Sequence, residues 1–274
     1  MTTTIEKKFE AIGARVKVIE PRRDGFSIDV RRDSEGEYFE LQVTKEIEML
    51  ILDAQKADRH LLLMTKAPVI NRKGDKTSEI KSKFLCGHDE RHWFTCAIPE
   101  SSRVTTVIGA KQALKPKELV DIETKEGVSK KNAHKRHRLL KTGKKIHRQG
   151  EFMFIPEPNF EPPKGNLTKI WRNEPMRGGG SHFHYAEFLY RVGGRQVYVI
   201  GSQVLETKDY QKLLKEQPEI AKRYRTMMAD PTVYVKGKIS HEEHATVNLD
   251  NVWHKVLVNT ENKARARTSV KFVD

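Results

Sequence analysis

The C-terminal half of the chain concentrates histidine, the side chain whose charge changes most readily near neutral pH. Five histidines lie there, in two close pairs and one single position: His182 and His184, His241 and His244, and His254. Without any metal, one histidine can serve as a base and another as an acid in phosphodiester cleavage, while a basic side chain stabilises the transition-state charge. These residue types predict a catalytic set, which is His184, His241, His254 and Arg177.

A glycine-rich segment, NEPMRGGGSH, leads into the first histidine pair. Backbone amides of such a loop can approach a phosphate group closely. The segment lacks the lysine of a Walker-type loop. We therefore interpret it as an approach to the histidines or as a flexible turn.

The stretch GGGSHFHYAEFLYRVGG resembles the first cupin motif, in which H-x-H is followed by a glutamate and a glycine. The matching positions are His182, His184, Glu187 and Gly193, and the last ligand falls on His254, before Asn259. This resemblance implies a divalent metal of unknown identity, bound by His182, His184 and His254. It also implies a small-molecule substrate.

A second stretch, EHATVNLDNVWHK, is similar to the His, Asn and His of an HNH nuclease. The matching positions are His244, Asn248 and His254. The resemblance implies that the first histidine activates water, while the last one binds a metal that stabilises the leaving oxygen.

The N-terminal half contains one further group of metal-competent residues, in CGHDERHWFTC. Pairing this hairpin about Arg91 would place Cys86 opposite Cys96, with His88 and His92 near the turn. Four such ligands could bind zinc. Cysteine on a strand also serves as a small core residue, so both interpretations stay open.

Between the halves lies a strongly basic tract, SKKNAHKRHRLLKTGKKIHR, which contains no acidic residue. It could be a solvated linker or a surface that neutralises phosphates, and the one-sided charge favours the surface. The candidate contacts are Lys130, Lys131, Lys135, Arg136, Arg138, Lys141, Lys144, Lys145 and Arg148. Trp171, in a proline-rich segment beside Arg172, is the candidate for stacking on a base.

The formal net charge of +14 over 274 residues favours a polyanionic partner, RNA or DNA. No run approaches the roughly 18 apolar residues that a bilayer span needs, so we expect no membrane insertion. The N-terminus lacks the pattern of a secretion signal, and two cysteines do not make a disulfide framework. We therefore expect a cytoplasmic protein.

The histidines must be positioned by strands, because short alternating apolar runs dominate the sequence. Residues 1 to about 63 are expected to be mainly strands, with hairpins at 84–99 and about Gly193–Gly194, and strands again after 231. A helix should begin near Ser102 or Thr105, with Pro116 ending or kinking it, and 207–230 should form two helices divided at Pro218.

This pattern predicts an α+β fold of mostly antiparallel hairpins with a few short helices, in two halves joined by the basic segment. The expected divisions are residues 1–128, the basic segment 129–149, and the histidine-rich half 150–274. The leading hypothesis is a nucleic-acid-binding protein, RNA favoured over DNA, which acts as a phosphodiesterase or nuclease. The alternatives are the cupin-like metal enzyme and a non-catalytic ribonucleoprotein subunit.

Overall fold

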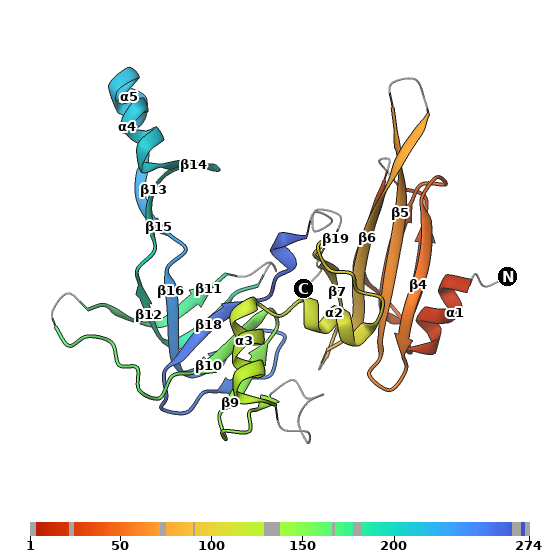
Figure 1. Cartoon of the computed structure of the whole chain (residues 1–274), viewed down its shortest axis with the longest axis horizontal. Helices are drawn as coiled ribbons and strands as arrows, with labels where there is room; N and C mark the ends of the chain where they lie inside the picture. The colour runs from red at the N-terminus through yellow and green to blue at the C-terminus, as the bar shows by residue number, and fades with distance from the viewer. Residues whose placement is uncertain are drawn as a thin grey trace.

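The protein was analysed as a computed structural model, which describes residues 4–21, 25–71, 75–89, 91–128, 138–165, 168–177, 182–264 and 270–271. Strands account for 50% of the chain and helices for 17%. Most strand pairs are antiparallel, so the expected α+β class is confirmed. Figure 1 shows sheets at the two ends of the molecule and a narrow arm that projects from one of them.

Two four-stranded sheets make up the N-terminal half. The first has the order β1 (Val16–Ile19), β3 (Gly36–Val43), β2 (Phe26–Asp33) and β19 (Val270–Lys271). The second has the order β4 (Glu48–Gln55), β5 (His60–Ile70), β6 (Lys76–His88) and β7 (Trp93–Ile98). All the strands expected before residue 65 are present. Helix α1 (Thr4–Ala11) was not expected, and its Phe9 is fully buried.

One hydrophobic core joins these two sheets, with Phe39 and Leu41 from the first and Leu63 and Phe84 from the second. Alternating apolar residues in the strands create the two faces that meet. Strand β19 pairs parallel with β2, so the C-terminal end of the described chain returns to the N-terminal half.

The β6–β7 hairpin forms in a register one residue away from the expected one. Cys86 pairs with Thr95, and Cys96 pairs with Leu85. A one-residue shift sends a side chain to the opposite face of a sheet, and the two cysteines accordingly lie in different cores. Burial raises the pKa of the Cys86 thiol to about 12. The predicted pairing was wrong, and the four zinc-competent residues are not brought together as one site.

Two helices follow the second sheet. Helix α2 (Val107–Ala113) begins after Thr106, whose hydroxyl accepts a hydrogen bond from the Gly109 amide. It packs on the face of the second sheet that is turned away from the first sheet and towards the C-terminal half (Figure 1), against a core that includes Leu62 and Leu85. Pro116 separates this helix from a second one, α3 (Lys117–Glu126), which agrees with the expected end or kink at this proline.

The C-terminal half is organised around an eight-stranded sheet. Its strands in spatial order are β11 (Ile170–Met176), β12 (His184–Val192), β16 (Thr232–Ser240), β18 (His254–Val258), β10 (Phe152–Pro156), β9 (Lys145–Gln149) and β8 (Arg138–Leu139), with β17 (Val247–Asn248) paired to β16. The described part of the basic tract is therefore folded into β8 and β9. The expected boundary at Gln149–Gly150 is the turn between β9 and β10.

The hairpin expected about Gly193–Gly194 does not form. Strand β12 pairs with β11 and β16, whereas β13 (Arg195–Ile200) pairs with β14 (Gln203–Glu206) and β15 (Arg225–Ala229). A Cβ atom on Gly194 would lie 2.6 Å from the Ala229 carbonyl oxygen, so glycine allows two chain segments to come close where they enter the arm.

The arm in Figure 1 carries helices α4 (Thr207–Glu216) and α5 (Pro218–Ala221), divided at Pro218 as expected. The helical prediction fails beyond them, because 225–229 is strand β15. None of the described helices has the length and apolar character that a bilayer span requires.

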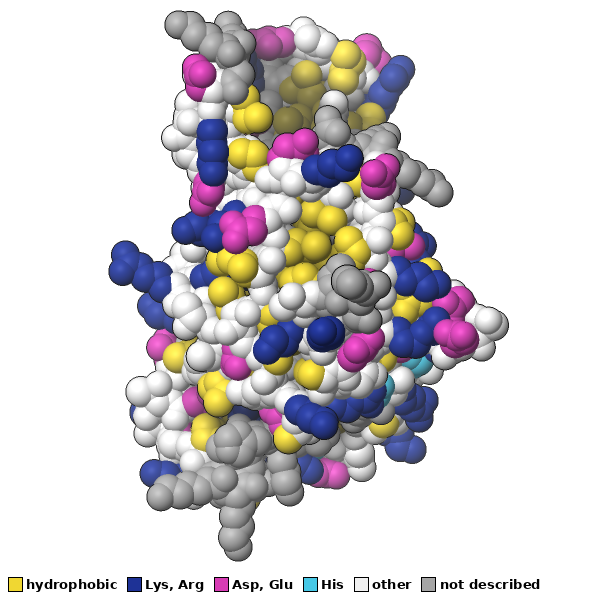
Figure 2. Space-filling view, turned by 90° about the vertical axis from the view of Figure 1, so that its right-hand side faces the viewer, with side chains coloured by type: hydrophobic (Ala, Val, Ile, Leu, Met, Phe, Trp, Pro, Cys, Tyr) yellow, Lys and Arg dark blue, Asp and Glu magenta, His cyan; other side chains and the backbone are white. Residues whose placement is uncertain are grey.

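The two halves make specific contacts near the end of the chain. Glu261 accepts a hydrogen bond from the Ala97 amide, and the Thr260 hydroxyl donates to the Ala113 carbonyl. Helix α3 itself packs on the eight-stranded sheet, where Leu119 is buried with Met153, and there Lys255 forms an ion pair with Glu118 at 2.7 Å. Figure 2 shows the outer face of the N-terminal half, where basic and acidic side chains are interspersed around hydrophobic ones. The charge on that face is mixed.

His60, at the start of β5, makes stability depend on pH. Burial, with a smaller effect of Lys111, lowers its pKa from 6.5 to about 4. Its contribution is complete above pH 6.5 and is lost as the pH falls towards 4, because the unfolded chain then binds the extra proton. We expect the unfolding free energy of His60→Gln to fall by about 1–2 kcal/mol less than that of the wild type when the pH is lowered. The full effect of the pKa shift is not expected, because the ring is partly exposed to solvent. Urea unfolding of the wild type and of His60→Gln at pH 7.5 and 4.5 measures this difference. An equal drop in unfolding free energy in both proteins would show that His60 is not the titrating group.

Candidate metal centre

Three histidines converge at one end of the eight-stranded sheet. His184, His241 and His244 each offer a ring nitrogen, and these three atoms lie within 4.8 Å of one another. The ring centroids are 4.3 Å apart for His184 and His241, and 4.5 Å apart for His241 and His244. This spacing is compatible with one small cation bound by all three rings.

Pairing of two strands brings this cluster together. Tyr185 of β12 pairs with Ser240 of β16, which places His184 beside the first residue after β16. That residue is His241, and the short loop to β17 then supplies His244. The third contribution is the turn after β9, at Gln149 and Gly150.

Gln149 holds His184 in a defined orientation. Its Nε2 donates to two backbone carbonyls, Ile239 at 3.3 Å and Ala245 at 2.8 Å. Its Oε1 lies 2.9 Å from His184 Nδ1. Because the two carbonyls fix which end of the amide is the donor, Nδ1 of His184 carries the proton and Nε2 of the neutral ring keeps its lone pair. An outer hydrogen bond of this kind positions many metal-binding histidines.

Gly150 leaves space in front of the histidines. Its φ of +56° lies in the left-handed region. A Cβ atom there would lie 3.3 Å from His184 Nε2 and 3.4 Å from His244 Nε2. Nε2 of His184 and Nε2 of His244 therefore both face the space that a side chain at position 150 would occupy.

Glu151 adds a carboxylate to this side of the cluster. Its Oε2 is 3.7 Å from His184 Nε2, and its side chain is 20% exposed, so solvent can reach it. Phe152 packs edge-on against the His184 ring, with centroids 4.8 Å apart. The site thus has an apolar wall on the core side and a carboxylate on the open side.

His241 makes a contact that bears on its protonation. Its Nδ1 accepts a hydrogen bond from the Glu243 amide at 3.1 Å. A neutral ring in this arrangement carries its proton on Nε2. A cation bound through either nitrogen would require the ring to give up the Glu243 contact, because that contact occupies Nδ1 and a free lone pair on Nε2 needs the proton on Nδ1.

The structure brings together two of the three predicted catalytic histidines, His184 and His241. His254 instead lies in β18, where it is 3% exposed and its Nδ1 is 2.9 Å from the Val252 carbonyl oxygen. Its ring contacts the His147 ring at a centroid distance of 5.8 Å. Burial lowers the pKa of His254.

The other predicted metal ligand, His182, lies at the rim of the cluster. Its Nδ1 is 2.8 Å from the Glu242 carboxylate, and its ring centroid is 6.1 Å from that of His241. Glu187, which the cupin resemblance adds, accepts a hydrogen bond from the Lys238 amide instead. The residues of the cupin pattern are not assembled around one point.

The HNH pattern is also separated in space. His244 belongs to the cluster, but Asn248 lies in β17 and accepts a hydrogen bond from the Asp250 amide. His254 lies on strand β18, where an HNH centre has a helix.

Arg177, the predicted catalytic cation, lies next to the histidine cluster. Met176 pairs with His184 across β11 and β12, so Arg177 follows immediately beside the cluster. It is exposed, with its guanidinium carbon 5.9 Å from the centre of the Phe183 ring. Residues 178–181 of the glycine-rich segment lie outside the described residues.

Of the predicted phosphate contacts, Lys130, Lys131, Lys135 and Arg136 lie outside the described residues. Arg138 and Lys144 form ion pairs with Glu123 and Glu126. Lys141 and Lys145 are exposed. Arg148 Nε donates to the Gly150 carbonyl at 2.9 Å.

Trp171 lies in a strand and not in the irregular segment that we expected. It is half-buried in β11, packs against the core of the sheet, and has Lys169 and Arg191 each 5.0 Å from its ring. A base would have to displace one of these cations to stack on it.

The sequence interpretation did not identify Gln149, Gly150 or Glu151. The only local signal is Gly150, which stands between the polar end of the basic tract and the apolar run that begins at Phe152. A glycine in this position weakly indicates a turn. No family model, curated protein or solved structure matches the chain.

Proposed function

We propose that the chain is a nucleic-acid phosphodiesterase, with RNA favoured over DNA, that uses a divalent transition metal held by His184, His241 and His244. The observation that carries this proposal is the Gln149 side chain, which is buried and directs the bare Nε2 of His184 into the cluster. Three imidazoles with an open position suit zinc and related ions that activate water.

The residues around the cluster suit hydrolysis of a phosphodiester. Glu151 can take a proton from the attacking water, and Arg177 can neutralise charge on the phosphorus oxygens. The new P–O bond forms from that water, and the bond to the leaving sugar oxygen breaks as this oxygen takes up a proton. The net charge of +14 favours a polyanionic substrate.

A second candidate mechanism cleaves the same bond without a metal. His241, in its protonated imidazolium form, would be the acid that gives a proton to the leaving oxygen. His184, with its bare Nε2, would then be the base.

Metal analysis together with a cleavage assay tests the proposal. We expect about one zinc, manganese or iron per chain, as for a single three-histidine site. Single-stranded RNA should be cleaved by the purified protein, EDTA should stop this cleavage, and the added metal should restore it. EDTA-resistant cleavage would favour the metal-free mechanism.

Three other results would contradict the proposal in distinct ways. Bound metal without affinity for RNA or DNA would favour an enzyme acting on a small molecule. Salt-sensitive RNA binding without turnover would favour a ribonucleoprotein subunit. Absence of both metal and nucleic-acid binding would remove the basis for all of these functions.

A further inference from the structure

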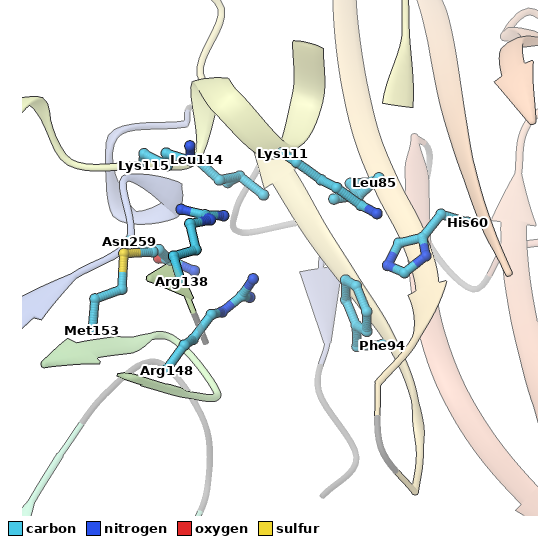
Figure 3. A pocket seen from close by; sticks show the side chains of 10 residues that line it. All are labelled: His60, Leu85, Phe94, Lys111, Leu114, Lys115, Arg138, Arg148, Met153 and Asn259. Atoms are coloured by element: carbon cyan, nitrogen blue, oxygen red, sulfur yellow. The ribbon is translucent and has the colours of Figure 1, made fainter. Parts of the chain in front are cut away.

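A small cavity lies between the two halves, apart from the histidine cluster. Its volume is about 30 Å³. Its walls come from β5, β6, β7 and α2 with the residues after it on one side, and from β8, β9, β10 and the chain after β18 on the other (Figure 3). The lining residues are His60, Leu85, Phe94, Lys111, Leu114, Lys115, Arg138, Arg148, Met153 and Asn259. This lining contains four cations and no carboxylate.

The four cations approach the cavity from both halves of the protein. Lys111 and Lys115 come from α2 and the turn after it, whereas Arg138 and Arg148 come from β8 and β9. Figure 3 shows both guanidinium groups on one side of the space and Lys111 with His60 on the other. Positive charges that converge where water is scarce repel one another unless an anion lies among them.

Two carboxylates close to the cavity pair with three of these cations. Glu123 accepts hydrogen bonds from both Lys115 and Arg138, whose side chains are only 9% and 17% exposed. Asp58 pairs with Lys111 at 3.0 Å. The Nε of Arg138 is buried and has no hydrogen-bond partner within the described part of the chain. An unsatisfied buried donor of this kind points to a missing acceptor.

We propose that this cavity binds one phosphate-type oxyanion, contacted by Arg138, Arg148 and Lys111. Guanidinium groups match the geometry of such oxyanions. A volume of about 30 Å³ is roughly that of two water molecules. The cavity therefore suits a single small anion and not a whole nucleotide. Apolar walls from Phe94, Leu114 and Met153 strengthen the attraction by excluding water.

The bound anion would connect the halves, because its contacts come from both. A ligand that binds only the folded protein raises stability with its concentration. Free inorganic phosphate and a backbone phosphate of nucleic acid share the required chemistry. The burial of Lys115 and Arg138 favours the free anion, because a polymer phosphate brings its sugars with it.

Inorganic phosphate, titrated into the full chain at constant ionic strength, tests the site by calorimetry and thermal unfolding. We expect saturable binding, and a rise in melting temperature that chloride does not produce. Arg138→Gln and the more exposed Lys111→Gln should each weaken phosphate binding at least tenfold. Lys144→Gln is the matched control: it also removes one cation, from a residue 42% exposed and paired with Glu126, and should leave binding unchanged.

Two further titrations separate this site from the histidine cluster and identify the source of the anion. His184→Ala should keep phosphate binding, so failure of the proposed enzyme would leave this site intact. A short DNA lacking terminal phosphates should not compete; competition would instead assign the site to a backbone phosphate. The proposal is overturned if the wild-type protein does not bind phosphate. It is also overturned if Arg138→Gln and Lys111→Gln bind as tightly as Lys144→Gln.

Discussion

Replacing His184 by alanine is expected to lower the rate of RNA cleavage by about 10³-fold and to remove the bound metal. In the proposed site the ring supplies one of the three ligand nitrogens, and its Nε2 faces the space in front of Gly150. The change also leaves the buried Gln149 Oε1 without its partner, which should cost about 1–3 kcal/mol of unfolding free energy. Cleavage assays, metal analysis and urea unfolding on one preparation measure all three effects.

His147→Ala is the matched control for this experiment. His147 is also a buried histidine in the same sheet, 8% exposed, but it contacts His254 and not the cluster. It should lose stability to a similar extent while keeping its metal and most of its activity. Equal loss of activity in both variants would trace the effect to destabilisation. Full metal content in His184→Ala would exclude this residue as a ligand.

Local patterns predicted the elements of the fold well. Alternating apolar residues placed the strands of residues 15–65, and Pro218 divided α4 from α5 as expected. These features depend on neighbours in sequence, through side-chain alternation and the missing amide of proline. Residues 225–229 were misassigned because Tyr224 and Met228 continue the helical spacing of α4, although β15 pairs with β13.

Strand partners were predicted less well, because they depend on residues far apart in sequence. Gly193–Gly194 has the composition of a hairpin turn, yet the chain passes there from the main sheet into the arm. A bulge between β12 and β16 was not predicted either. The register shifts between Ala186 and Phe188, and buried and exposed residues stop alternating after Glu187. Gly237, with its φ of +83°, lies opposite on β16. A regular strand would put His184, Phe188 and Tyr190 on one face, and the bulge interrupts that face.

The candidate site was predicted only in part for the same reason. His184 and His241 were identified from residue type, and the β12–β16 pairing then brings them together. His184 and His241 lie at the Ser240 end of β16, whereas His254 pairs with Val235, five residues earlier on the same strand. His254 is therefore separated from the other two histidines. Gln149 ends a tract whose charge dominates its composition, and nothing local indicates that its amide reaches the carbonyls of residues 239 and 245.

Replacing Gln149 by leucine is the second change from which we expect a large effect. Gln149 is fully buried and makes three hydrogen bonds, two to backbone carbonyls and one to His184. Leucine fills a similar volume but leaves these groups unsatisfied, so the unfolding free energy should fall by about 3 kcal/mol. Metal affinity should fall by about 10–100-fold, because the His184 ring loses the bond that fixes its proton on Nδ1.

Gln149→Glu separates the positioning of His184 from the general support of the loop. Glutamate can still accept the proton of His184 Nδ1, but it can no longer donate to the Ile239 and Ala245 carbonyls. We expect it to be destabilised like the leucine variant while keeping most of the metal affinity. Nitrogen-15 shifts of the His184 ring should report a proton on Nδ1 in the wild type and in Gln149→Glu, and a mixture of tautomers in Gln149→Leu. If both variants lose metal in proportion to stability, with the same tautomer as the wild type, Gln149 supports the loop and does not orient the ring.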